Sequence, residues 1–176
     1  IAKYRFVLQL EEPFGISRVT RTEEERTYIE VDGGWGEAAP ASYYGEDEST
    51  VRAALDALNA VELGDLDLIA DVIDRANAAV TGNRAAKAAL DIALHDRLGK
   101  ALGLPLWKLF GRAPSRPLVT SFTIGIDTPD VMLDKTERAS RFDILKIKLG
   151  RDVAVVEPGV PDGIRVDGVS QNHSSP

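Results

Sequence analysis

Two lysines separated by one residue are the side chains of this sequence best suited to chemistry. Lys146 and Lys148 lie in the segment Ile144–Gly150, where apolar residues and lysines alternate. Because successive side chains of a β-strand point to opposite faces, both ammonium groups would lie on the same face. Crowding two like charges at a strand end lowers the pKa of one amine, which makes a lysine usable as a base near neutral pH. The segment predicts a lysine pair for proton transfer; the alternative is an edge strand with a solvated lysine face.

The residues upstream predict the elements that would position this pair. Leu118–Ile124 has the composition of a strand, and Thr128 followed by Pro129 is typical of the first turn of a helix. With the lysine strand at residues 142–149, the order is strand, helix, strand. The parallel strands of such a unit are normally covered on both faces, where unused lysines are unfavourable.

The first part of the chain predicts a small antiparallel sheet. Tyr4–Leu10 is rich in strand-forming residues and is predicted to stop at Glu12–Pro13. Thr27–Asp32 predicts a second strand, and Gly33–Gly34 is a hairpin signal after which Trp35–Ala38 returns.

Three helices are predicted next, because the apolar residues change to a helical period. The first begins near Ser49–Thr50, the second covers Leu68–Val80, and the third has Asn83 as its N-cap and Gly103 at its end. The Gly111–Pro117 segment is the best candidate for a linker between domains.

Composition limits the classes of partner. The 176 residues carry a net charge of −7 and no cysteine, which argues against nucleic acid or an anionic membrane as partner and against disulfides or thiolate metal sites. No segment reads as a signal peptide or membrane span. We expect a small-molecule or protein partner and a cytoplasmic location, and the sequence is compatible with a homo-oligomer.

Six segments in order resemble the enolase superfamily, in its muconate-lactonising-enzyme-like branch, and are most similar to the dipeptide epimerases typified by L-Ala-D/L-Glu epimerase. The resemblance covers the chain from about Lys3 to Asp152. The segments that carry it are Gly34–Pro40, Tyr44–Glu46, Ala86–Leu94, Gly103–Leu106, Thr120–Ile126 and Lys146–Lys148.

The resemblance implies an α+β capping domain, made of an antiparallel sheet and a helical bundle, followed by the beginning of a (β/α)8 TIM-type barrel. The expected division is a capping domain at residues 1–111, the first βαβ unit of the barrel at 118–152, and an aberrant or disordered tail at 153–176. A complete barrel of this type needs roughly 250 residues, so the chain is expected to be truncated after the second barrel strand. The Phe14–Arg21 segment, predicted to be a loop, would be the part of the cap that contacts substrate.

The resemblance also implies roles for individual residues. Lys148 would be the acid/base that acts on the substrate α-proton, and Lys146 would tune it and interact with the substrate carboxylate. Thr123 would line the substrate pocket, and Arg18 is a candidate for binding a substrate carboxylate. Asp167, in a segment similar to the strand that carries the first metal carboxylate, would be a ligand of Mg²⁺, which stabilises the enediolate formed when the α-proton leaves.

The implied activity is Mg²⁺-dependent epimerisation of dipeptides such as L-Ala-L-Glu. The isolated chain is expected to be inactive, because the family takes its other metal ligands and the opposing lysine from later barrel strands. A muconate cycloisomerase or an o-succinylbenzoate synthase of the same superfamily is the nearest alternative. An alternative of another class is a non-catalytic module that binds a partner through the faces a barrel would cover.

Overall fold

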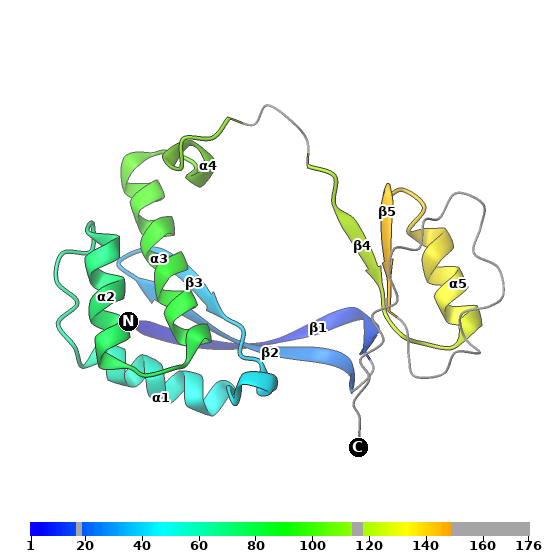
Figure 1. Ribbon diagram of the computed structural model, residues 1–176, viewed down its shortest axis with the longest axis horizontal. Helices are drawn as coiled ribbons and strands as arrows, with labels where there is room; N and C mark the ends of the chain where they lie inside the picture. The colour runs from blue at the N-terminus through cyan, green and yellow to red at the C-terminus, as the bar shows by residue number, and fades with distance from the viewer. Residues whose placement is uncertain (17–18, 114–117, 149–176) are drawn as a thin grey trace, which may run out of the picture. The chain divides into compact units, whose positions relative to one another are not determined.

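The structure, a computed structural model, describes residues 1–16, 19–113 and 118–148 (Figure 1). The chain divides into two compact units, one of Ile1–Glu11 with Thr22–Pro117 and one of Glu12–Arg21 with Leu118–Pro176. Residues 12–21 lie inside the capping domain predicted at residues 1–111 and group with the second unit by their contacts; the predicted domain division itself stays a prediction. The contacts are backbone and ionic ones, between these residues and the elements that follow residue 118.

A three-stranded sheet has the order β1-β2-β3, with β1 at Ala2–Ile16, β2 at Val19–Val31 and β3 at Gly34–Ala38. Its strands belong to the first unit except for residues 12–21. Strands β2 and β3 are antiparallel, and Val31 pairs with Gly34. The turn is therefore Asp32–Gly33, one residue earlier than predicted. Both of its residues have positive φ, 47° and 83°, as a type I′ hairpin turn requires.

Strand β1 is longer than the sequence predicted. It continues through Glu12–Pro13 to Ile16, and β2 already begins at Val19, so most of Phe14–Arg21 is strand and not the predicted loop. A proline is compatible with β1 because β1 is an edge strand, where a missing N–H need not interrupt a ladder.

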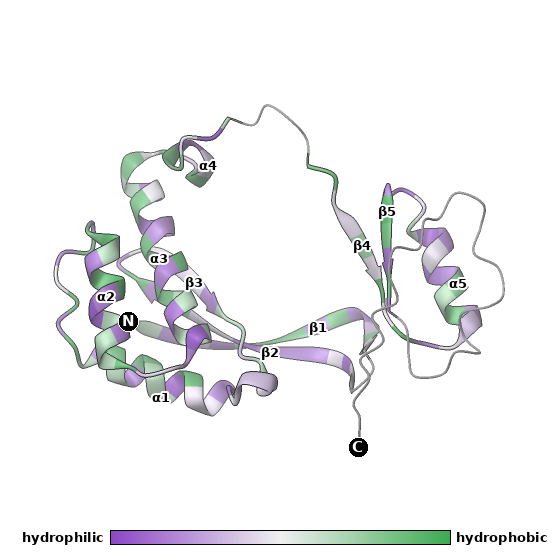
Figure 2. Ribbon diagram, in the orientation of Figure 1, coloured by the Kyte–Doolittle hydropathy of each residue, from purple (hydrophilic) through white to green (hydrophobic). Residues whose placement is uncertain are grey.

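Helices α1 (Glu48–Asn59), α2 (Ile69–Ala79) and α3 (Arg84–Leu102) complete the first unit, with the short helices η1 (Ser42–Tyr44) and α4 (Leu106–Leu109). Hydrophobic and hydrophilic residues interleave along the three long helices (Figure 2), and one side of each contributes to a shared core. The core also takes side chains from β2 and β3; its largest fully buried members are Ile29, Val51, Leu55, Leu58, Val72, Leu90 and Leu94.

Two glycines of β3 allow α3 to pack directly on the strand. A β-carbon added to Gly34 would lie 2.1 Å from the carbonyl oxygen of Ala93, and one added to Gly36 would lie 1.9 Å from that of Ala89. No side chain fits at these separations. The glycines of the Gly34–Pro40 segment thus have a packing role, which places α3 against the sheet.

The long helices begin and end with specific hydrogen bonds. Asn83 caps α3, as predicted, with its side chain accepting from the N–H of Ala86, and Gly103 ends it at φ 63°. The N-cap of α1 is Asp47, not the predicted Ser49–Thr50, and it exchanges hydrogen bonds with Thr50 in a capping box. These bonds satisfy backbone groups that have no partner within the helix.

Glu46 joins the segment before α1 to the start of α3. Its side chain is 9% exposed, and its two oxygens accept from the N–H groups of Arg84 and Ala85 at 2.7 and 3.1 Å. A carboxylate at a helix N-terminus is favourable because the N–H groups there carry partial positive charge. This contact explains a glutamate at the end of Tyr44–Glu46.

The second unit contains β4 (Ser121–Ile124), α5 (Pro129–Arg138) and β5 (Ile144–Ile147), with β4 and β5 parallel. As predicted, Thr128 is the N-cap of α5 and Pro129 its first residue. A helix between two parallel neighbouring strands is the crossover that the sequence predicted. Among the described residues, no helix is long and apolar enough to cross a bilayer.

Candidate active site

Lys146 and Thr123 are neighbours on adjacent parallel strands. In the register of β4 and β5, Thr123 pairs with Lys146 and Ile124 pairs with Ile147. The N–H of Lys148 donates to the carbonyl of Ile124 at 2.9 Å, so the ladder continues one residue past β5. Paired residues of parallel strands lie on the same face, and so do residues two apart along a strand. Thr123, Lys146 and Lys148 therefore share one face of the sheet.

The other face of the sheet is apolar. Ile124 lies on this face and is 1% exposed, and α5 contacts β4. Phe122, on the same face as Ile124, stacks on Phe142 with 4.8 Å between ring centroids. The alternation that the sequence predicted for the lysine strand thus separates an apolar face from a face that carries the lysines.

The two lysines differ in exposure. Lys146 is exposed, whereas Lys148 and Thr123 are half-buried within the described part of the chain. The described residues bring the three side chains to one face but do not enclose them. The exposure of Lys146 agrees with the alternative of an edge strand whose lysine face is solvated. Lys148, at the carboxyl end of β5, is the less exposed of the two lysines.

The end of β1, residues Glu12–Gly15, which we call the hairpin tip, contacts the segment that follows β4. The N–H of Ile126 donates to the carbonyl of Gly15 at 2.9 Å. A β-carbon on Gly15 would lie 2.2 Å from the carbonyl oxygen of Ile126, and one on Gly125 would lie 3.0 Å from the nitrogen of Gly15. The hairpin backbone therefore meets the carboxyl end of β4, two residues beyond Thr123. Arg18, the candidate for binding carboxylate, lies outside the described residues.

A magnesium site does not form from the residues that the structure describes. Within residues 1–16, 19–113 and 118–148, no group of three or more His, Asp or Glu side chains is arranged to hold a metal ion. Asp167, the predicted ligand, lies outside these ranges.

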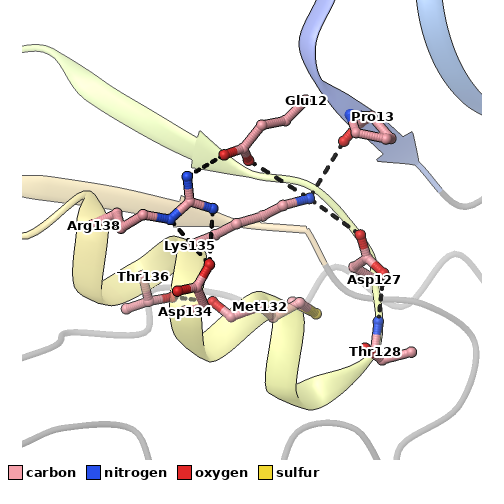
Figure 3. A network of polar contacts seen from close by, with 9 residues as sticks. All are labelled: Glu12, Pro13, Asp127, Thr128, Met132, Asp134, Lys135, Thr136 and Arg138. Atoms are coloured by element: carbon pink, nitrogen blue, oxygen red, sulfur yellow. Dashed lines mark hydrogen bonds and ion pairs between the residues drawn. The ribbon is translucent and has the colours of Figure 1, made fainter.

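Sequence reasoning missed a cluster of ion pairs beside the hairpin tip. Lys135 and Arg138 of α5 pair with Glu12 of β1, and Lys135 also pairs with Asp127, which follows β4 (Figure 3). The N–H of Thr128 and the Lys135 ammonium hold the pKa of Asp127 below its ordinary value. Glu12 is more than a hundred residues from α5 in the sequence, so no local pattern could have predicted their ion pairs.

More than half of the chain matches a known family. Residues 3–111 match the mandelate racemase / muconate lactonizing enzyme family, N-terminal domain. The L-Ala-D/L-Glu epimerase of Bacteroides thetaiotaomicron is 39% identical over 154 residues, which are 85% of this chain and 40% of that enzyme.

Solved structures resemble both units. A dipeptide epimerase from Enterococcus faecalis, complexed with Mg and the dipeptide L-Leu-L-Tyr, matches with a TM-score of 0.77 and 28% identity, over 88% of this chain and 46% of that one. A substrate-liganded L-Ala-D/L-Glu epimerase from Bacillus subtilis matches with a TM-score of 0.74 and 29% identity, over 86% of this chain and 45% of that one.

The chain thus spans less than half the length of these relatives. The matches confirm the predicted fold class, an α+β capping domain followed by the first strand-helix-strand elements of a barrel. They also confirm the resemblance to the dipeptide epimerases of the enolase superfamily. Since the family match covers more than half of the residues, this chain belongs to the mandelate racemase/muconate lactonizing enzyme family.

Proposed function

We propose that this chain supplies the capping domain and the acid/base lysines of a Mg²⁺-dependent dipeptide epimerase. The observation that carries the proposal is the shared face of Thr123, Lys146 and Lys148 at the carboxyl ends of two parallel strands. In barrels built from such strands, catalytic groups gather at this end. The dipeptide epimerases among the relatives supply the reaction class.

In this proposal Lys148 is the base that removes the α-proton of the dipeptide residue that carries the carboxylate. Its half-buried position at the strand end favours it over the exposed Lys146. Lys146, on the same face, presents a positive charge to the substrate carboxylate, and Thr123 borders the substrate beside it. The proton that Lys148 accepts can return to the same carbon, so these residues by themselves account for exchange on one face.

Inversion of the α-carbon needs two further groups. The enediolate left by proton removal requires stabilising positive charge, which Mg²⁺ supplies when bound, and a donor must face the opposite side of the carbon. The described residues provide neither a metal-binding group of carboxylates nor a second pair of lysines on a facing strand. We therefore expect the isolated chain not to epimerise L-Ala-L-Glu above the background rate.

A joined protein tests the proposal. It consists of residues 1–148 of this chain followed by the remainder of the Bacteroides thetaiotaomicron epimerase, which is 39% identical over the matched region. We expect it to exchange the α-proton of the Glu residue of L-Ala-L-Glu for deuterium in D₂O, to epimerise the dipeptide, and to lose both activities when Mg²⁺ is chelated. Proton NMR follows the loss of the α-proton signal, and chiral chromatography follows the product.

Substitution of the proposed base sharpens this test. Lys148→Met keeps most of the length of the side chain and removes the amine, and should lower kcat/KM by on the order of 10²–10⁴-fold. Lys87→Met, on α3 of the first unit, is the control and should leave kcat/KM near that of the unsubstituted protein. A folded joined protein that is inactive towards dipeptides but active on a muconate substrate, or an active Lys148→Met variant, would refute the proposal.

A further inference from the structure

The polar cluster beside the hairpin tip centres on Lys135. Its side chain is 10% exposed, and its ammonium donates to Oδ2 of Asp127 at 3.1 Å and to the carbonyl of Pro13 at 3.4 Å. Oε2 of Glu12 lies 3.9 Å from the same nitrogen. Figure 3 shows these contacts converging on a single amine. One charge on α5 therefore reaches both β1 and the segment that follows β4.

Arg138 reinforces the contact with β1. Its guanidinium pairs with Glu12, and on its other side with Asp134 at 2.9 Å (Figure 3). The pairing with Glu12 holds the pKa of Arg138 above its ordinary value. Arg138 is 55% exposed, so solvent screens its ion pairs more strongly than those of Lys135. Solvent therefore weakens the ionic contacts of the sheltered lysine less than those of Arg138.

An apolar residue could fill the space that Lys135 occupies, so packing alone does not explain a lysine there. Burial of an ammonium group is unfavourable unless anions and acceptors surround it, and here two carboxylates and a carbonyl do so. Two of these three partners, Glu12 and Pro13, belong to β1. Lys135 therefore loses these two partners when the hairpin tip leaves α5. The buried ammonium group is thus favourable only while the hairpin is docked.

The docked hairpin in turn places Gly15 on Ile126. Pro13 and Gly15 are two residues apart on β1, and their partners Asp127 and Ile126 are adjacent in the chain. The ionic contacts and the Gly15–Ile126 hydrogen bond therefore connect the same two segments at neighbouring positions. Loss of the ionic contacts should weaken the backbone bond, whereas the β4–β5 ladder shares no partner with them.

We propose that Lys135 is a positioning residue that holds the tip of the β1–β2 hairpin on Gly125–Ile126, beside Thr123 at the carboxyl end of β4. It acts through Gly15 and Ile126 and does not itself meet a substrate. That the hairpin thereby borders a substrate rests on the proposed function. The positioning of the hairpin by Lys135 does not, and can be tested on the 176-residue chain without any activity.

Amide hydrogen exchange, followed by NMR on the ¹⁵N-labelled chain, measures the contact directly. The amide of Ile126 is bonded to Gly15, and the amide of Lys148 is bonded to Ile124 in the same unit. In Lys135→Met, which keeps most of the aliphatic stem, the Ile126 amide should exchange faster by about tenfold or more, because local opening then needs less free energy. The Lys148 amide should exchange at its original rate, since the β4–β5 ladder is unchanged.

Two controls accompany this variant. Lys135→Arg keeps the charge and should restore much of the protection at Ile126. Lys100→Met removes a lysine that also donates to a carbonyl, that of Gly33 at 2.9 Å, and to a carboxylate, that of Asp96 at 2.6 Å, but in the first unit. It should leave the Ile126 amide unaffected.

A second variant approaches the cluster from the hairpin. Glu12→Gln removes the negative charge that Lys135 and Arg138 both contact while leaving α5 intact. It should also accelerate hydrogen exchange at the Ile126 amide and not at the Lys148 amide. The proposal is overturned if the Ile126 amide keeps its exchange rate in both variants. It is also overturned if the Ile126 and Lys148 amides both exchange faster, because Lys135 would then stabilise the whole unit and not the hairpin contact. Failure of the joined protein to epimerise dipeptides would leave these exchange rates, and their meaning, unchanged.

Discussion

Gly36 of β3 lies against the backbone of Ala89 of α3, so closely that a β-carbon on the glycine would be 1.9 Å from the Ala89 carbonyl oxygen. Both contacting groups are backbone atoms, which cannot move aside as the end of a flexible side chain can. The separation between helix and sheet in the first unit is therefore set by the absence of a side chain at this position.

Gly36→Ala should lower the free energy of unfolding by about 1–3 kcal/mol, the usual range for overpacking a close contact. Urea denaturation measures it. Gly33→Asn is the control: it also enlarges a glycine of the β2–β3 region, but at a turn position with open space and positive φ. Asparagine adopts positive φ more readily than most residues, so this variant should lose less stability than Gly36→Ala. An equal loss of stability in both variants would contradict the packing role of Gly36.

Glu46→Ala should destabilise the first unit by about 1–3 kcal/mol, because it leaves the N–H groups of Arg84 and Ala85 without the acceptors they have now. Glu46→Gln keeps one side-chain oxygen and should lose less. Thermal unfolding followed by circular dichroism compares the two. If alanine and glutamine behave alike, the carboxylate does not serve as the cap of α3.

The cap of α1 predicts a dependence of stability on pH. The backbone N–H of Thr50 and the hydroxyls of Ser49 and Thr50 lower the pKa of Asp47 in the folded state. The contribution of the ionised carboxylate to stability is therefore present above the pKa that Asp47 has in the unfolded chain, and is lost as pH falls through the lower folded pKa. Asp47→Asn keeps an acceptor but does not titrate.

The difference in urea midpoint between the natural chain and Asp47→Asn isolates this effect from the other carboxylates. The natural chain should be the more stable of the two near pH 6, and the difference should shrink as pH falls below about 3.9, the usual unperturbed value for Asp. A difference that stays constant over this range would show that the charge of Asp47 does not contribute.

Thr123→Val tests the proposed substrate pocket in the joined protein. Valine preserves the branched shape on β4 and removes the hydroxyl, so the pairing with Lys146 should persist. If the hydroxyl contacts the dipeptide, kcat/KM should fall by about tenfold or less, the effect of a single neutral hydrogen bond. Thr136→Val on α5, whose hydroxyl bonds the carbonyl of Met132, is the control and should leave kcat/KM unchanged.

Local patterns were sufficient to predict several elements. Asn83 and Gly103 delimit α3 as predicted because each satisfies helix-end groups with atoms close by in sequence. The alternation of Ile147 with its flanking lysines likewise predicted the strand, and the half-buried and exposed residues of β5 alternate as expected. In both cases the deciding interactions are local or involve the next element.

Other features depended on long-range contacts and were not predictable. The sequence predicted that the first strand stops at Pro13. The strand continues because it lies at the edge of the sheet, where a proline is tolerated. The link between Lys135 and Pro13 spans 122 residues, and neither residue stands out in its own segment. The predicted ligand Asp167 and the candidate Arg18 lie outside the described residues and stay predictions.

Because residues 12–21 are grouped with the elements after residue 118, the polypeptide passes from one unit to the other three times. A single protease nick in the Gly111–Pro117 segment would therefore leave two pieces that each contribute to the second unit, and they should remain associated until denatured. Expression of residues 1–113 and 118–176 as separate polypeptides would likewise divide one folding unit between two genes. The two units are thus not interchangeable modules, and any recombination at that segment must carry a compatible hairpin with it.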